Sequence, residues 1–94
     1  MIEVRFYENR DLDSVNTILE EAFKVSKSNF NNSSIKEIVA LADGNVCGYL
    51  VLTKVLNPIL NKYYYLVDYV CVLSSYHGRG IGKKLLSFAE DVAL

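Results

Sequence analysis

A run of alternating glycines near the end of the chain has the residue types of an anion-binding turn. It reads His77-Gly78-Arg79-Gly80-Ile81-Gly82 and is followed by Lys83 and Lys84. Glycine allows backbone conformations that a Cβ resists, and successive N–H groups in such a turn can converge on an anion. A helix starting here adds the positive end of its dipole. The sequence therefore predicts a phosphate or pyrophosphate site, against the alternative of a turn that only connects two elements.

Two well-known phosphate-binding motifs do not fit this run. A P-loop requires Gly, four residues and then Gly-Lys-Ser/Thr, but His77 stands at the first position and Lys84 at the last. The dinucleotide fingerprint G-x-G-x-x-G requires a glycine at its sixth position. That position is Lys83 when the motif is read from Gly78 and Leu85 when it is read from Gly80. Neither motif is present.

The elements on either side of the run must position it. Tyr63 to Leu73 predicts a strand that is apolar on both faces, as in a central strand covered on both sides. A helix is predicted from Gly80 to the end of the chain. Its apolar stripe consists of Ile81, Leu85, Phe88, Ala89 and Val92.

The first half of the chain predicts a strand and a helix. Residues 1–7 alternate apolar and polar, as in a half-buried strand. A helix is predicted over 11–24, capped by Asn9 or Asp11, with an apolar stripe made of Leu12, Val15, Ile18, Leu19, Ala22 and Phe23. Residues 27–34 are polar and predict a loop, with or without a short helical turn, in which Phe30 packs over the core or an acceptor pocket.

Two further strands are predicted over 35–42 and 46–55. Asp43-Gly44-Asn45 between them is a hairpin signal, so these strands should pair antiparallel. Gly48, inside the second of them, indicates a close approach by another group. Residues 56–62 form a connection.

Composition limits the class of protein. The 94 residues predict a single domain, 1–94, with a net charge of −1 that argues against a nucleic-acid-binding surface. No apolar run is long enough for a membrane span and no signal peptide is recognisable, so a cytoplasmic location is expected. Cys47 and Cys71 are expected to be buried reduced thiols, and no Cys/His cluster predicts a metal site.

The glycine run resembles the pyrophosphate loop of the GNAT superfamily of acetyl-CoA-dependent N-acetyltransferases, Gln/Arg-x-x-Gly-x-Gly/Ala after a strand and opening a helix. His77 stands where Gln or Arg is usual. Residues 2–5 and 11–15 resemble the opening strand and first helix of the family, and residues 38–49 its second and third strands. The resemblance implies an α/β (α+β) fold with a mixed, mainly antiparallel sheet, cut short after the helix that follows the loop.

The resemblance also implies the site. The loop would hold the pyrophosphate of acetyl-CoA. The preceding strand, which is often bulged in the family, would hydrogen-bond the pantetheine arm. The alternative is that this strand is a plain central strand with no free backbone groups. The implied cofactor residues are Val70, Cys71, Val72, His77, Gly78, Arg79, Gly80, Ile81, Gly82 and Lys83. A backbone N–H in the strand is a candidate oxyanion donor.

Asp68 is the one acidic residue in the apolar run and the candidate catalytic base, because burial would raise its pKa. The alternative is an exposed Asp, or one that only positions the amine. Cys71 as a nucleophile is the less favoured alternative to direct transfer. Tyr64, Tyr65, Tyr69 and Tyr76 are expected to be structural, and the usual acid of the family, a Tyr, has no counterpart.

The implied function is acetyl transfer from acetyl-CoA to a primary amine of a small molecule or peptide by direct attack. The alternative is a non-catalytic CoA-binding or interaction module, or an inactive fragment. A strand with an open edge and a helix with an uncovered apolar face invite association. A homo-oligomer that covers the edge of the strand over 63–73 is therefore expected.

Overall fold

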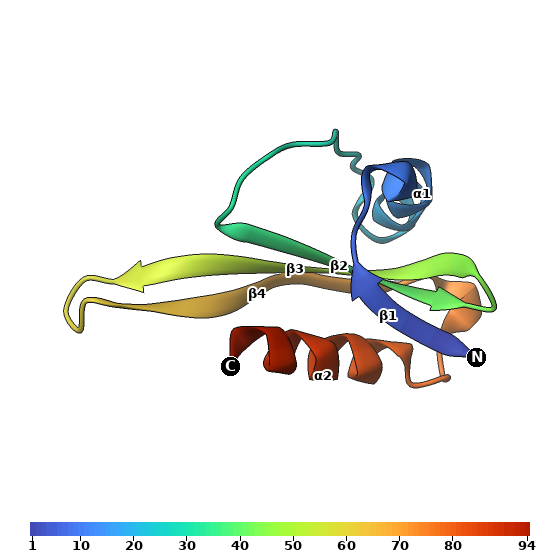
Figure 1. Cartoon of the computed structure of the whole chain (residues 1–94). Helices are drawn as coiled ribbons and strands as arrows, with labels where there is room; N and C mark the ends of the chain where they lie inside the picture. Colours follow the sequence, from blue (N-terminus) through green and yellow to red (C-terminus); the bar gives the residue numbers. More distant parts are fainter.

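The computed structural model describes all 94 residues as one four-stranded sheet with a helix on each face (Figure 1). In chain order the elements are β1 (Ile2–Phe6), α1 (Leu12–Phe23), β2 (Ile35–Ala42), β3 (Asn45–Asn57), β4 (Lys62–Val72) and α2 (Ile81–Ala93). Single 3₁₀ turns precede the two helices, at Asn9–Asp11 and Ser74–Tyr76. Neither helix is long and apolar enough to cross a membrane.

The strands lie in the order β1-β2-β3-β4, and all three pairings are antiparallel. The predicted hairpin between β2 and β3 is confirmed, with positive φ angles at Asp43 (50°) and Gly44 (84°). The predicted connection over 56–62 is too long. β3 and β4 remain paired as far as Asn57 and Lys62, because the Asn57 side chain accepts the N–H groups of Ile59 and Leu60 and closes a short turn.

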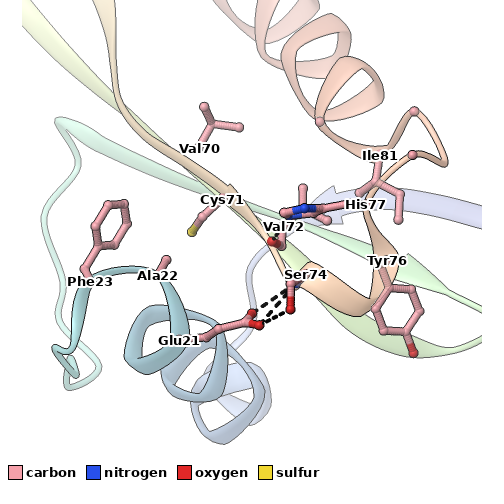
Figure 2. A pocket seen from close by; sticks show the side chains of 13 residues that line it. Glu21, Ala22, Phe23, Val70, Cys71, Val72, Ser74, Tyr76, His77 and Ile81 are labelled. Carbon is pink, nitrogen blue, oxygen red and sulfur yellow. Dashed lines mark hydrogen bonds between the residues drawn. The ribbon is translucent and has the colours of Figure 1, made fainter.

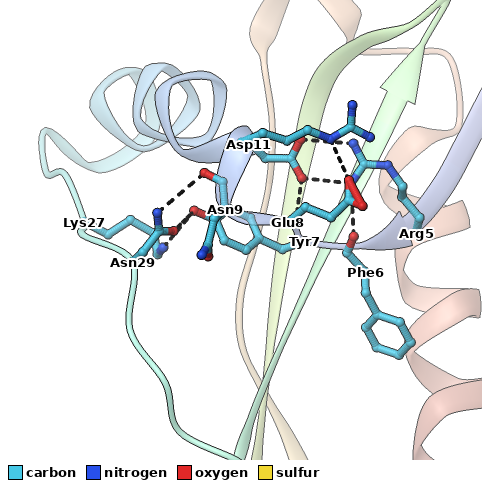
Figure 3. A network of polar contacts seen from close by, with 9 residues as sticks. Arg5, Phe6, Tyr7, Glu8, Asn9, Asp11, Lys27 and Asn29 are labelled. Carbon is cyan, nitrogen blue, oxygen red and sulfur yellow. Dashed lines mark hydrogen bonds and ion pairs between the residues drawn. The ribbon is translucent and has the colours of Figure 1, made fainter.

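The predicted loop over 27–34 is present, and it contains no helical turn. The predicted side-chain cap of α1 is also wrong. Asp11 stands at the N-cap but makes no capping bond. Its carboxylate instead accepts two hydrogen bonds from Arg5, at 2.8 and 3.0 Å, and one from the Glu8 N–H at 2.8 Å (Figure 3). Arg5 and Asp11 thus fix the entry to α1 from β1.

Each helix buries the main part of its predicted stripe against one face of the sheet, while Ala22 and Phe23 at the end of the α1 stripe are exposed. Val15, Ile18 and Leu19 of α1 pack on β2 and β3. Ile81, Leu85 and Ala89 of α2 pack on the opposite face. Gly48 makes this second contact possible, since a Cβ there would lie 3.0 Å from Leu85 Cδ1, and the predicted close approach is confirmed.

β4 is not the covered central strand that its apolar sequence indicates. It lies at the edge of the sheet, with β3 on one side only, so the open edge expected for the strand over 63–73 is confirmed. Leu66, Val67 and Val70 are therefore 40–49% exposed, although their residue types suit a buried strand. The long β3–β4 hairpin also projects beyond both helices (Figure 1).

Candidate functional site: a cleft at the end of β4 and a neighbouring groove

A cleft of about 690 Å³ opens between the C-terminal part of α1, the end of β4 and the loop that leads into α2 (Figure 2). Eight of the ten predicted cofactor residues line it: Val70, Cys71, Val72, His77, Gly78, Gly80, Ile81 and Gly82. Arg79 and Lys83 do not. The Arg79 guanidinium lies 5.0 Å from the centre of the Tyr76 ring.

Two of the three glycines adopt the conformation for which glycine was expected. Gly78 has φ 81° and Gly80 has φ 75°, the left-handed region that L side chains rarely adopt. No heavy atom lies within 4 Å of a Cβ built on either residue, so the backbone there borders open space. Gly82 differs, because it lies in the first turn of α2 with ordinary helical φ.

The first turn of α2 presents free donors to the cleft. The Lys84 N–H donates to the Gly80 carbonyl oxygen at 3.1 Å, the first intrahelical bond. The N–H groups of Ile81, Gly82 and Lys83 therefore have no partner within the helix. Gly80, the N-cap residue, has no side chain to cap them. The positive end of the helix dipole thus lies at one end of the cleft with these three free donors, of which those of Ile81 and Gly82 belong to residues that line it.

The backbone of β4 supplies a second set of polar groups. The Leu73 N–H donates to the Cys47 carbonyl oxygen of β3 at 2.8 Å. Because residues of an antiparallel strand alternate between facing the partner and facing away, Cys71 also faces β3, while Val70 and Val72 direct their N–H and C=O groups to the open edge. Of the three predicted pantetheine contacts, the backbone geometry suits Val70 and Val72 but not Cys71.

His77 ties the loop to the strand. Its Nε2 lies 2.8 Å from the Val72 carbonyl oxygen. Since a carbonyl oxygen only accepts, Nε2 carries the proton in this contact. One of the outward groups of Val72 is therefore used within the protein, and its N–H remains directed to the edge.

Sequence reasoning did not find the contribution of α1 to the cleft. The Glu21 carboxylate accepts the Ser74 N–H, at 3.1 Å to Oε2, and the Ser74 hydroxyl (Figure 2). These two hydrogen bonds from Ser74 lower the pKa of Glu21 below its ordinary value. They hold the end of α1 to the segment after β4 and so fix the width of the cleft. The sequence carried no signal for a contact between residues 53 positions apart.

A bulge in β4 shapes the neighbouring part of the sheet. Val51 pairs with Tyr69 and Leu52 with Val67, so Asp68 is the extra residue. Asp68 and Tyr69 consequently lie together at a second hollow, a groove of about 440 Å³ on the α1 face. Phe23, Phe30, Thr53, Ile35 and Leu19 also line this groove.

Asp68 is exposed, so the burial on which the predicted base role depended is absent. Its Oδ2 accepts a hydrogen bond from the Thr53 hydroxyl. It forms no ion pair. Of the two alternatives stated for Asp68, the exposed carboxylate is the one that the structure contains.

The wall of the groove near β2 contains a compact polar cluster. Glu37 Oε1 lies 3.2 Å from Lys27 Nζ and accepts the Tyr49 hydroxyl at 2.6 Å. Burial, together with the neighbouring Glu37 carboxylate, raises the pKa of Tyr49 well above its ordinary value. Lys27 Nζ also lies 3.4 Å from the Tyr7 hydroxyl, which in turn donates to Asn29 (Figure 3). This cluster holds the loop over 27–34 against the sheet.

The Cys71 thiol has the environment of a structural group. Burial raises its pKa, and its Sγ lies 3.8 Å from the Tyr49 carbonyl oxygen. A thiol that stays protonated is a poor nucleophile. The environment of Cys71 therefore does not suit a nucleophile. His, Cys, Asp and Glu side chains form no group of three or more that could hold a metal ion.

Comparison with known proteins gives the same architecture. The Acetyltransferase (GNAT) family matches residues 3–94. The fold is similar to that of a ribosomal-protein-alanine N-acetyltransferase from Brucella melitensis biovar Abortus 2308, with a TM-score of 0.84 and 20% identity, over 99% of this chain and 71% of that one.

Two more solved structures share the fold. A GNAT family acetyltransferase from Staphylococcus aureus has a TM-score of 0.84 and 17% identity, over 98% of this chain and 77% of that one. An aminoglycoside acetyltransferase from an uncultured soil metagenomic sample, in complex with sisomicin, has a TM-score of 0.80 and 17% identity, over 98% and 69%. No protein with a curated description matches the sequence. With the family match spanning 92 of 94 positions, the chain belongs to the GNAT family of acetyltransferases.

Proposed function

We propose that this protein binds acetyl-CoA in the cleft at the end of β4 and transfers the acetyl group to a primary amine. The observation that carries the proposal is the convergence of two kinds of backbone donor on one cleft. The uncapped N–H groups of Ile81, Gly82 and Lys83 suit a pyrophosphate, and the outward groups of Val70 and Val72 suit an amide-bearing arm.

The cleft fits such a ligand in size and chemistry. Its 690 Å³ lies within the range of small-molecule sites. Arg79, between Gly78 and Gly80, and Lys83, directly after Gly82, do not line the cleft but would add positive charge to the surroundings of a bound phosphate. His77 keeps the loop and β4 in a fixed relation through its bond to Val72.

Acetyl-CoA, when bound, supplies the acetyl group as a thioester. The bound ammonium would first lose one proton. Attack of the neutral amine nitrogen on the thioester carbon would then form the N–C bond and break the C–S bond, and a second proton would pass from the nitrogen to the departing sulfur, directly or through water. The Val70 N–H, directed to the open edge, is the candidate donor to the carbonyl oxygen. Asp68, two residues before it, is the candidate group to hold the ammonium, which would release its first proton to water.

A thiol-release assay with acetyl-CoA and a panel of primary amines tests the transfer. We expect amine-dependent release of free thiol, together with a product whose mass exceeds that of the amine by one acetyl group. Stabilisation of the protein by acetyl-CoA without thiol release for any amine would contradict transfer. It would instead support the alternative function, a non-catalytic CoA-binding module.

A further inference from the structure

The groove and the cleft meet at one aromatic contact. Phe23 lines both hollows, and its ring packs edge-on against Tyr69, with centroids 5.5 Å apart. Asp68 lies on the groove side of this contact, and Val70 lines the cleft. Two residues along a strand span about 7 Å, so a group held by Asp68 lies close to the outward groups of Val70.

The charges of the groove are nearly balanced within the protein. Lys27 is 13% exposed and pairs with Glu37 at 3.2 Å. Asp68 has no cationic partner, and its bond from Thr53 occupies Oδ2 and leaves Oδ1 free. The groove therefore offers one uncompensated negative charge, which matches one ammonium group and not several.

Most of the remaining lining of the groove is apolar, with Ser26 and Thr53 as the exceptions. Its lining includes Leu19, Phe23, Val25, Phe30, Ile35 and Val51. Phe30 is 48% exposed even though it is a large aromatic side chain on a polar loop. Such a surface gains free energy by covering apolar groups of a ligand, and gains none from hydroxyl-rich or highly charged ones.

We infer that the acceptor is a primary monoamine carried on an apolar body, aromatic or branched alkyl. Its ammonium is bound by Asp68 and its body lies against Phe30 and Phe23 in the groove. This inference rests on the proposed function for the fate of the amine, but the binding of the amine can be measured without acetyl-CoA.

Three primary amines test separately the single charge and the apolar body that we infer for the acceptor. 2-Phenylethylamine has one charge and an apolar body, ethanolamine has one charge and no apolar body, and spermidine has several charges. We expect kcat/KM for 2-phenylethylamine to exceed that for each of the other two amines by about tenfold or more, since even small apolar groups discriminate to this extent in a fitted pocket.

Two pairs of variants test whether Phe30 causes the preference for an apolar body and Asp68 the binding of the ammonium. Phe30→Ala should reduce the preference for 2-phenylethylamine over ethanolamine by about tenfold. Phe6→Ala is the matched control, because Phe6 has the same 48% exposure but packs against Phe88 of α2 on the other face. Asp68→Asn should weaken binding of all three amines, and Asp91→Asn on the exposed side of α2 should not.

Ligand-observed NMR with 2-phenylethylamine alone distinguishes failure of the inference from failure of the proposed function. Saturable binding that Phe30→Ala weakens, without acetyl transfer, would support the groove and contradict the proposed reaction. Transfer to spermidine or ethanolamine with equal or greater efficiency would overturn the inferred acceptor class and leave the reaction intact. Absence of binding by 2-phenylethylamine would also overturn the inference.

Discussion

Substituting Gly82 by Ala should separate the stability of the protein from its affinity for acetyl-CoA. Gly82 has ordinary helical φ, and a Cβ there would meet only Val72 Cγ2, at 4.0 Å. Alanine in a helix is more favourable than glycine by about 0.5–1 kcal/mol, so Gly82→Ala should raise the unfolding free energy of the ligand-free protein by up to that amount. For a domain of this size the melting temperature should rise by about 2–8 °C.

The same methyl group should leave the binding of acetyl-CoA nearly unchanged. Gly82 lines the cleft, and its N–H is one of the three free donors at the start of α2. Alanine keeps that N–H, and the GNAT loop pattern accepts Gly or Ala at the position of Gly82. At a ligand concentration of 100 times the wild-type Kd, the stabilisation by acetyl-CoA should therefore remain about 2.7 kcal/mol, whereas a tenfold loss of affinity would reduce it to about 1.4 kcal/mol.

Thermal melts with and without acetyl-CoA measure both effects in one experiment. Gly80→Ala is the matched comparison, because Gly80 has φ 75° and its substitution should lower the unfolding free energy by about 1–2 kcal/mol through backbone strain. Its methyl group would also enter the open space of the cleft, at the position where the loop pattern requires glycine, and should weaken the binding of acetyl-CoA by about tenfold. A Gly80→Ala protein that acetyl-CoA still stabilises as much as the wild type would refute a pyrophosphate site at this turn.

Three further predictions concern the scaffold and its edge. Asp11→Asn should lower the unfolding free energy in urea by about 2 kcal/mol at neutral pH, because Arg5 loses its partner. The Arg5 hydrogen bond lowers the pKa of Asp11 in the folded protein. The stability that the ionised Asp11 contributes is therefore complete above the ordinary carboxyl pKa of 3.8 and is lost as the pH falls below 3.8 toward the lowered pKa. If the wild type and Asp11→Asn differed as much in unfolding free energy at pH 2 as at neutral pH, this account would be contradicted. Gly48→Ala should destabilise by about 1–3 kcal/mol through the contact with Leu85 Cδ1, and a neutral urea midpoint would contradict the close packing. A second copy is predicted to cover the exposed β4 edge, so sedimentation should show a dimer that Val67→Lys dissociates, and a wild-type monomer would disprove the association.

The sequence predicted the helices, the β2–β3 hairpin and the close approach at Gly48 because each has a local cause. The stripes of α1 and α2 follow the helical period, and Asp43-Gly44 has the residue types of a tight turn. The apolar run of β4 by itself indicated a covered central strand, because such a run has the same composition in a central strand as in an edge strand; the open edge of β4 was expected only from the family resemblance.

The site was predictable where it depends on backbone conformation within one segment. The turn from His77 to Gly82 carried its own signal, namely the spacing of the glycines. The contact between Glu21 and Ser74, and the groove formed by Phe30 with Asp68, join residues far apart in the sequence. Only the packing of α1 and its following loop on the sheet brings these residues together, so no local pattern indicates them.

The binding of acetyl-CoA to the cleft can be tested most directly by titrating the ¹⁵N-labelled protein and following its backbone amides. The amides of Gly78, Gly80 and Gly82, together with those of Val70 and Val72, should show the largest saturable shifts. The amides of β1 and of the distal β3–β4 turn should change little. Saturable shifts confined to other residues, or no shifts at millimolar acetyl-CoA, would contradict the site.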